Sequence, residues 1–154
     1  MVCLIDLGLR AIEVARLRLD SIDWQGRSMR VPAAKAGGGR HLPLPTGVLM
    51  AFRKYLRVRP RTAAEHFFVG QCALAGRALS SCAIRAVVDR AYRRCGMERL
   101  FGTHRLRHSF ATRLFARGCT LKEIADLLGH RRIATTERYT QAKDMRFIAQ
   151  PWPE

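Results

Sequence analysis

The stretch that most constrains the fold of this chain runs from Thr103 to Thr140, THRLRHSFATRLFARGCTLKEIADLLGHRRIATTERYT. Gly118 and Gly129 divide it into three segments, and each segment is predicted to form a helix, the first capped by Thr103. Thr120 and Glu123 match the T-x-x-E capping box that marks the first turn of a helix. In the first helix the side chains expected to face the core are Leu106, Phe110, Leu114 and Phe115.

The rest of the chain predicts further helices and one small sheet. The first 19 residues are apolar and helical in character, and Arg10 and Glu13 fall within one turn. Two later helices are predicted after caps at Thr46 and Ser80. The apolar stripe of the second comprises Ala83, Ile84, Val87, Val88, Ala91, Tyr92 and Cys95.

Short extended runs interrupt the helical pattern between the first two helices. Residues 22–24, 29–32 and 41–44 are separated by glycine-containing turns and predict a three-stranded antiparallel sheet. A further short buried strand is expected at residues 66–69. The predicted fold class is therefore mainly α, an α+β domain with its small sheet near the N-terminus.

Charge is the main functional signal in the composition. The 154 residues fit one domain and carry 28 Lys and Arg against 12 Asp and Glu, a formal charge of +16. Such an excess indicates a polyanionic partner. The alternatives are a basic protein that is merely soluble and a membrane-surface protein, and no segment approaches the ~18 apolar residues that a span requires. The five cysteines lack C-x-x-C spacing and are interpreted as buried thiols in a reducing cytosol.

Two histidines, an arginine and a tyrosine in the helical stretch suit one reaction. His104 and Arg107 lie one helical turn apart, His130 follows the next helix, and Tyr139 comes nine residues later. A tyrosine hydroxyl has an ordinary pKa near ~10 and is a weak nucleophile at neutral pH. Its attack on a phosphodiester requires neutralisation of the phosphate charge, removal of the phenolic proton and protonation of the leaving oxygen.

Cationic side chains of the chain can meet these three requirements. Arginine binds two phosphate oxygens with its planar fork, so Arg10 and Arg107 are candidates for neutralising the phosphate. His104 and His130 can share a proton or donate to phosphate. Lys35, at the approach to the turn of three glycines, is a candidate for protonating the leaving group.

Each of these residues also has an ordinary structural interpretation. The arginines and Lys35 could be solvated surface cations, and Tyr139 could be an ordinary amphipathic tyrosine. His104 and His108 are spaced as a zinc pair on a helix, but Arg105 stands where the H-E-x-x-H motif has its glutamate. Their order and spacing along the chain favour the catalytic interpretation over these alternatives.

Five segments of the chain resemble the catalytic domain of tyrosine recombinases, the phage-integrase family. They are GLRAIEVARLRLDSIDW (8–24), VPAAKAGGGRHLPLP (31–45), HRLRHSFATRL (104–114), LLGH (127–130) and TTERYT (135–140). The resemblance implies a catalytic set of Arg10, Lys35, His104, Arg107, His130 and Tyr139, with Glu13 in support. Given the overall positive charge, the basic residues expected to contact DNA are Arg40, Arg85, Arg105, Arg131 and Arg132.

The resemblance implies a mechanism and partners. Tyr139 would attack the scissile phosphate to give a 3′-phosphotyrosyl bond and a free 5′-hydroxyl, with no metal or other cofactor. Double-stranded DNA is the expected partner, in the bacterial cytoplasm at the nucleoid, and the family's tetramer on paired sites is a further expectation. The single domain at 1–154 is expected to lack the family's N-terminal DNA-binding domain and the first helix of the catalytic domain.

Two other functions stay open on the sequence alone. A chain of this length could be a DNA-binding module that retains the site but cannot recombine. A metal-dependent hydrolase that uses the histidines is the other alternative.

Overall fold

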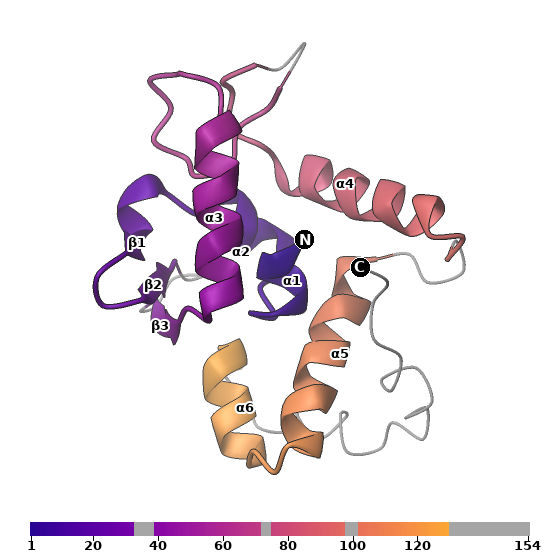
Figure 1. Ribbon diagram of the computed structural model, residues 1–154. Coiled ribbons are helices and arrows are strands. Elements are labelled where there is room, and N and C mark those ends of the chain that lie inside the picture. The colour runs from indigo at the N-terminus through magenta and orange to yellow at the C-terminus, as the bar shows by residue number, and fades with distance from the viewer. Residues whose placement is uncertain (33–38, 72–74, 98–101, 130–154) are drawn as a thin grey trace.

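The computed structural model describes residues 1–32, 39–71, 75–97 and 102–129, and it confirms a mainly helical domain with a small antiparallel sheet (Figure 1). In chain order the elements are α1 (Val2–Ile5), α2 (Ala11–Ala15), the 3-10 helix η1 (Leu19–Ser21), β1 (Ile22–Asp23), β2 (Ser28–Val31), β3 (Arg40–Pro43), α3 (Thr46–Val58), α4 (Ser81–Arg94), α5 (Thr103–Ala116) and α6 (Leu121–Leu128).

The N-terminal segment is two short helices, not the continuous helix that its apolar pattern suggests. Gly8 separates α1 from α2 and has a positive φ of +60°. A Cβ at this position would lie 2.4 Å from Cδ1 of Phe110 and 2.9 Å from Cδ2 of Leu128. The chain therefore turns at Gly8 where α1 meets α5 and the end of α6, and the turn places Arg10 at the N-cap of α2.

The three strands form the predicted meander in the order β1-β2-β3, with each boundary within one or two residues of its predicted place. Met29 pairs with both Ile22 and Leu42, and all three side chains are buried. Residues 66–69 do not form a regular strand. Phe67 instead donates its backbone N–H to the carbonyl of Leu17 at 2.7 Å and packs its ring against Phe52.

The caps of α3 and α5 differ from the predictions by one residue. Pro45 and Gly102 are the N-caps, and Thr46 and Thr103 are the first helical residues. The Thr46 hydroxyl accepts a hydrogen bond from Arg27 at 2.6 Å, so this side chain serves the sheet turn instead of the helix end. Ser80 does cap α4, because its hydroxyl accepts from the N–H of Ala83 at 3.1 Å.

Several apolar side chains predicted inside are exposed. Val87 in α4 and Phe115 in α5 are 47% and 42% exposed, since the faces on which they lie have no covering element among the described residues. Cys82 and Cys95 are also exposed, so their assignment as buried thiols was wrong, whereas Cys3 is buried. The capping box of α6 is confirmed, with Gly129 as its left-handed C-cap. The helix predicted to carry Tyr139 lies outside the described residues.

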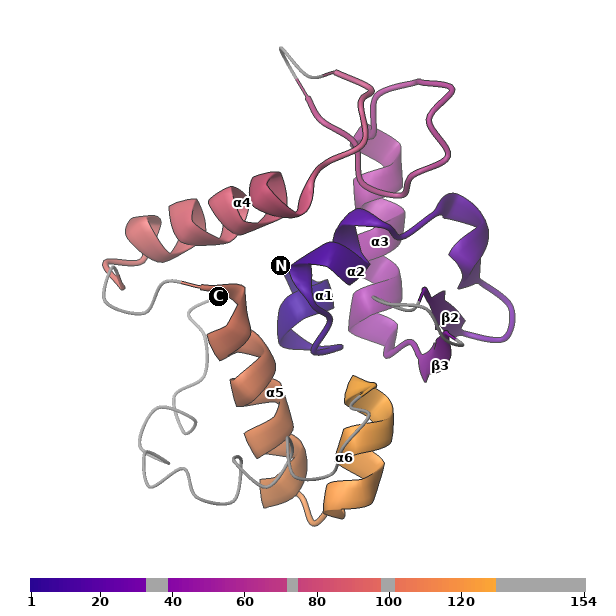
Figure 2. The same cartoon turned by 180° about the vertical axis from the view of Figure 1, so that it is seen from behind.

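The helices bring distant parts of the chain to one place. α5 packs against α1 and α6, and α2 packs against α4 (Figures 1 and 2). Three hydrogen bonds described below connect the C-terminal end of α6 to the N-terminus of α2, to the start of β3 and to α5.

Gly8→Ala is expected to destabilise the fold by about 2–4 kcal/mol, because it combines left-handed backbone strain with overpacking against Phe110 and Leu128. The measurement is urea unfolding followed by circular dichroism. Gly47→Ala is the matched control, since a Cβ there meets nothing within 4 Å and alanine favours the helix. Equal stability of the two variants would contradict the close packing described at Gly8.

Candidate active site

Arg107 projects from the first turns of α5 into the protein and is only 2% exposed. Its guanidinium donates to the carbonyl of Gly8 at 2.6 Å and to the carbonyl of Leu128 at 2.5 Å. A buried cation is costly unless it is paired and hydrogen-bonded. Arg107 meets that condition, with a carboxylate oxygen of Glu13 also 3.8 Å from its Nη1 atom.

Arg10 and Glu13 are held together by the start of α2. The Glu13 carboxylate accepts from the backbone N–H of Arg10 at 2.8 Å and from its guanidinium at 3.0 Å. This reciprocal arrangement satisfies donors that the first turn of a helix leaves unpaired. The Arg10 guanidinium also lies 3.4 Å from the carbonyl of Leu128, so that oxygen is shared with Arg107. The structure thus brings the two predicted phosphate-binding arginines together.

Arg40 completes the cluster from the first residue of β3. Its Nη1 and Nη2 atoms donate to the two oxygens of Glu13, each at 3.1 Å, and its Nε donates to the carbonyl of Leu127 at 2.7 Å. The sequence groups Arg40 with residues expected on DNA, but its guanidinium is turned to these internal acceptors and its side chain is only 16% exposed. The last carbonyls of α6 need partners, and arginines supply them here.

The cluster keeps a positive charge. Three guanidiniums, those of Arg10, Arg40 and Arg107, face the single carboxylate of Glu13, which leaves a formal +2. Burial alone would raise the pKa of Glu13, which is 1% exposed. Hydrogen bonds from Arg40 and from the Arg10 backbone, with the charges of Arg40 and Arg107, outweigh burial and hold the pKa below its ordinary value.

The low pKa of Glu13 predicts how stability depends on pH. A carboxyl whose folded pKa lies below its unfolded value stabilises the fold above the unfolded value, near 4.5, and this contribution is lost as the pH falls through the folded pKa. Glu13→Gln is expected to cost about 3 kcal/mol at pH 7, because it leaves buried cations uncompensated. The difference from the wild type should narrow below pH 4.5.

Urea unfolding at several pH values measures this difference. The matched control is Glu65→Gln, which removes an exposed carboxylate paired with Arg18 at the surface. The control should leave the free energy of unfolding at pH 7 unchanged within error. A difference between wild type and Glu13→Gln that stays constant down to acid pH would contradict the buried ion cluster.

A pocket of about 190 Å³ opens beside the cluster. Arg10 and Arg107 line it together with His104, which is exposed on the first turn of α5. Arg85 reaches the same pocket from α4. Three predicted catalytic side chains and one predicted DNA contact therefore border a single cavity that is open to solvent.

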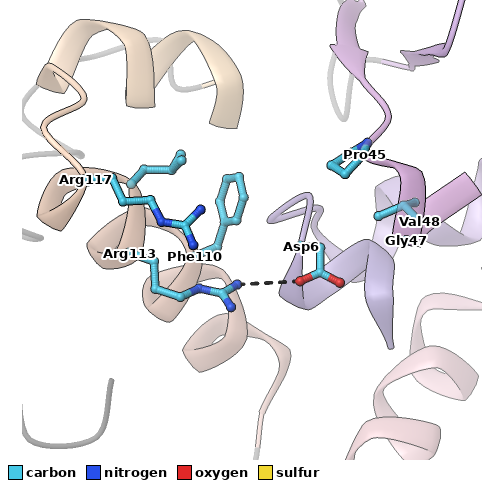
Figure 3. Close-up of a pocket in the computed structure, with 8 residues that line it drawn as sticks. Asp6, Pro45, Gly47, Val48, Phe110, Arg113 and Arg117 are labelled. Atoms are coloured by element: carbon cyan, nitrogen blue, oxygen red, sulfur yellow. Dashed lines mark ion pairs between the residues drawn. The ribbon is translucent and has the colours of Figure 1, made fainter. Parts of the chain in front are cut away.

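A larger pocket of about 380 Å³ lies elsewhere along α5 (Figure 3). Phe110, Arg113 and Arg117 project from α5 toward Asp6 and the start of α3, with Arg113 and Asp6 paired at 3.9 Å. None of the predicted site residues lines this pocket. We place the candidate active site at the smaller pocket because the charged cluster lies there.

The remaining predicted site residues fall into two groups. Arg105 is exposed on α5 and does not border the pocket. Lys35, His130, Tyr139, Arg131 and Arg132 lie outside the described residues.

Among the described residues, His104 and His108 belong to no group of three or more potential metal ligands. Burial lowers the pKa of His108, with help from the charges of His104 and Arg105. No helix in this part of the chain is both long and apolar enough to cross a bilayer.

Sequence reasoning missed the contacts that hold the site together. The backbone carbonyls of Gly8 and Leu128 carry no side-chain signal, and their role appears only when the helices pack. That a glycine, Gly129, ends α6 could be predicted from the sequence, but the contact of Gly129 with Arg40 could not. A Cβ on Gly129 would lie 2.8 Å from the Arg40 Nη1 atom.

Solved structures share this architecture. The crystal structure of the XerA recombinase superposes with a TM-score of 0.83 at 25% identity, covering 98% of this chain and 57% of that chain. The XerH site-specific recombinase bound to its difH substrate gives a TM-score of 0.75 at 24% identity, covering 95% of this chain and 43% of that one. The class defined by the fold is therefore the catalytic domain of tyrosine recombinases.

The chain belongs to the phage integrase family, whose model matches residues 1–146. It is 37% identical over 151 residues to y4rA of Sinorhizobium fredii, a protein named as an integrase or recombinase, covering 96% of this chain and 36% of that protein. It is 35% identical over 147 residues to the tyrosine recombinase XerC of Alcanivorax borkumensis, covering 93% of this chain and 46% of that protein. The chain spans less than half the length of these relatives.

Proposed function

We propose that this chain is the catalytic part of a site-specific DNA recombinase that cleaves and rejoins strands through a 3′-phosphotyrosyl intermediate on Tyr139. The observation that carries the proposal is the cluster of Arg10 and Arg107 beside an open pocket, with a formal +2 shared among three guanidiniums and Glu13. A preorganised positive site of this kind stabilises the charge that develops on a phosphate during substitution. Membership of the integrase family supports the same reaction.

In the proposed reaction the two arginines bind the non-bridging oxygens of the scissile phosphate. The Tyr139 oxygen forms a bond to phosphorus and gives up its proton, and the bond from phosphorus to the 5′-oxygen breaks. His104, at the edge of the pocket, accepts the phenolic proton of Tyr139, and Lys35 donates a proton to the leaving 5′-oxygen. His130 donates a hydrogen bond to the phosphate, and the chain reaches it two residues after Leu128. Attack by a 5′-hydroxyl reverses the step and rejoins a strand.

The positions of the two arginines are fixed by the protein before any anion binds. Arg107 is fixed by two carbonyls, and Arg10 by Glu13, so their side-chain entropy is already lost before DNA binds. Arg10 is 36% exposed and faces the pocket, which leaves it accessible to a phosphate. Double-stranded DNA is the proposed partner, and the structure of the XerH site-specific recombinase was solved with its difH substrate bound.

The test of the proposal is trapping of a covalent adduct. The 154-residue chain is mixed with a labelled pool of short nicked duplexes of randomised sequence, and the products are separated on denaturing gels with and without EDTA. We expect a protein–DNA adduct that is insensitive to EDTA. A native-gel shift without adduct would support the binding-module alternative, and EDTA-sensitive cleavage would support the metal-dependent hydrolase.

A further inference from the structure

We propose that Arg40 is a positioning residue of the phosphate site: by binding both oxygens of Glu13, it keeps that carboxylate from competing with a phosphate for Arg10 and Arg107. This inference rests on the proposed function for its substrate, but its structural basis is independent of DNA. Arg40 would act through Glu13 and the end of α6, and its guanidinium would not contact the phosphate.

The first observation is how the hydrogen bonds accepted by the Glu13 carboxylate are divided between Arg10 and Arg40. Each oxygen of the carboxylate accepts one hydrogen bond from Arg40 at 3.1 Å and one from Arg10, whose backbone N–H and guanidinium each contribute one. Arg107 lies at 3.8 Å, outside hydrogen-bond distance. Arg40 is thus the bidentate partner, and bidentate arginine–carboxylate pairs are the strongest of their kind.

The second observation is that the Glu13 carboxylate is buried among three arginines. The carboxylate is 1% exposed, so water cannot take the place of a lost hydrogen bond. The charged groups that face it are Arg10 from the start of α2, Arg40 from β3 and Arg107 from α5. With Arg40 removed, the two arginines assigned to phosphate would be the remaining ion-pair partners of Glu13 among the described residues.

The third observation is that Arg40 connects β3 to the end of α6. Its Nε donates to Leu127 near the end of α6, and its side chain packs on Gly129, where a Cβ would come within 3.3 Å of the Arg40 Cδ. β3 follows the segment that contains Lys35, which precedes Arg40 by five residues. Arg40 therefore links the strand after the proposed acid to the helix end whose carbonyl binds Arg10 and Arg107.

The experiment measures binding of inorganic sulfate, a tetrahedral anion whose charge does not change between pH 5 and 7.5. Arginine Nε–H signals of the 15N-labelled chain report the titration in wild type, Arg40→Met, Glu13→Gln and the double variant. Arg30→Met is the matched control, because Arg30 is exposed on the neighbouring strand and its loss removes the same charge. Circular dichroism verifies that each variant is folded. Arg40→Lys keeps the charge without the fork, and it replaces the methionine variant if that variant does not fold.

We expect Arg40→Met to weaken sulfate binding at pH 7.5 by about tenfold, and Arg30→Met to change it by less than about twofold. Adding Glu13→Gln to Arg40→Met should recover most of the loss, since the competing charge is removed. Lowering the pH toward 5 should also reduce the difference in sulfate affinity between Arg40→Met and wild type. A Glu13 carboxylate without its Arg40 partner takes up a proton more readily, and its competing charge is then lost. A purely structural role would produce neither recovery.

Sulfate binding by folded Arg40→Met within twofold of wild type would overturn the proposal, as would a double variant no better than the single one. The adduct assay on nicked DNA separates this result from failure of the proposed function. Wild type that binds sulfate with the expected Arg40 dependence but forms no adduct would refute the recombinase reaction and leave the role of Arg40 standing. Adduct formation by the wild type, together with sulfate binding that does not depend on Arg40, would support the recombinase reaction and refute the role of Arg40.

Discussion

Tyr139→Phe is expected to abolish the covalent protein–DNA adduct while leaving DNA affinity within about twofold of wild type. The substitution removes only the hydroxyl oxygen that attacks phosphorus, and the cations that bind the DNA backbone are unchanged. Denaturing gels measure the adduct and native gels measure the affinity, on the same nicked duplexes.

The chain provides matched controls for this variant because it has three tyrosines. Tyr55 and Tyr92 belong to α3 and α4, and the Tyr55 hydroxyl accepts a hydrogen bond from the N–H of Val69 at 3.0 Å. Tyr55→Phe and Tyr92→Phe should both retain the adduct. Persistence of the adduct in Tyr139→Phe, or its loss in either control, would assign the nucleophile elsewhere.

Arg107→Met is expected to have the second largest effect, because it lowers both the stability of the fold and the rate of adduct formation. The change leaves the carbonyl of Gly8 without its arginine donor, leaves the carbonyl of Leu128 with only the longer hydrogen bond from Arg10, and removes a cation from beside Glu13. Breaking a buried charged cluster in this way costs about 3–5 kcal/mol. Loss of one well-placed donor to the phosphate lowers the rate of adduct formation by roughly 10²–10³-fold.

Urea unfolding and single-turnover adduct formation measure the two effects separately. Arg117→Met is the matched control, because Arg117 is exposed at the end of the same helix and its loss removes the same charge. The control should stay within about 0.5 kcal/mol of wild type. A stability of Arg107→Met equal to that of the control would contradict the buried position of Arg107.

Much of the fold follows from local signals in the sequence. The capping box at Thr120 and the serine cap at Ser80 were predicted correctly because each cap is decided by residues within one turn of it. The sheet was also predictable, since alternating burial and turn residues fix a short meander. The predictions at Thr46 and Thr103 were wrong by one residue, because Pro45 and Gly102 take the cap position.

The predictions that failed more clearly depend on tertiary packing. Whether Val87 and Phe115 are covered depends on which elements pack against α4 and α5, and periodicity along a helix does not contain that information. The same limit applies to the site. The order of Arg10, His104 and Arg107 indicated a shared site, and the structure brings them to one pocket. The internal role of Arg40 could not be predicted, because it depends on Glu13 and the end of α6 meeting β3.

The central claim is that a phosphate held by Arg10 and Arg107 is attacked by the oxygen of Tyr139. Mass spectrometry of the trapped adduct, after digestion by nuclease and protease, tests it most directly. We predict a peptide in which Tyr139 carries a nucleotide through its 3′-phosphate, and no modified peptide containing Tyr55 or Tyr92. A nucleotide attached to any other residue, or linked through a 5′-phosphate, would contradict the claim.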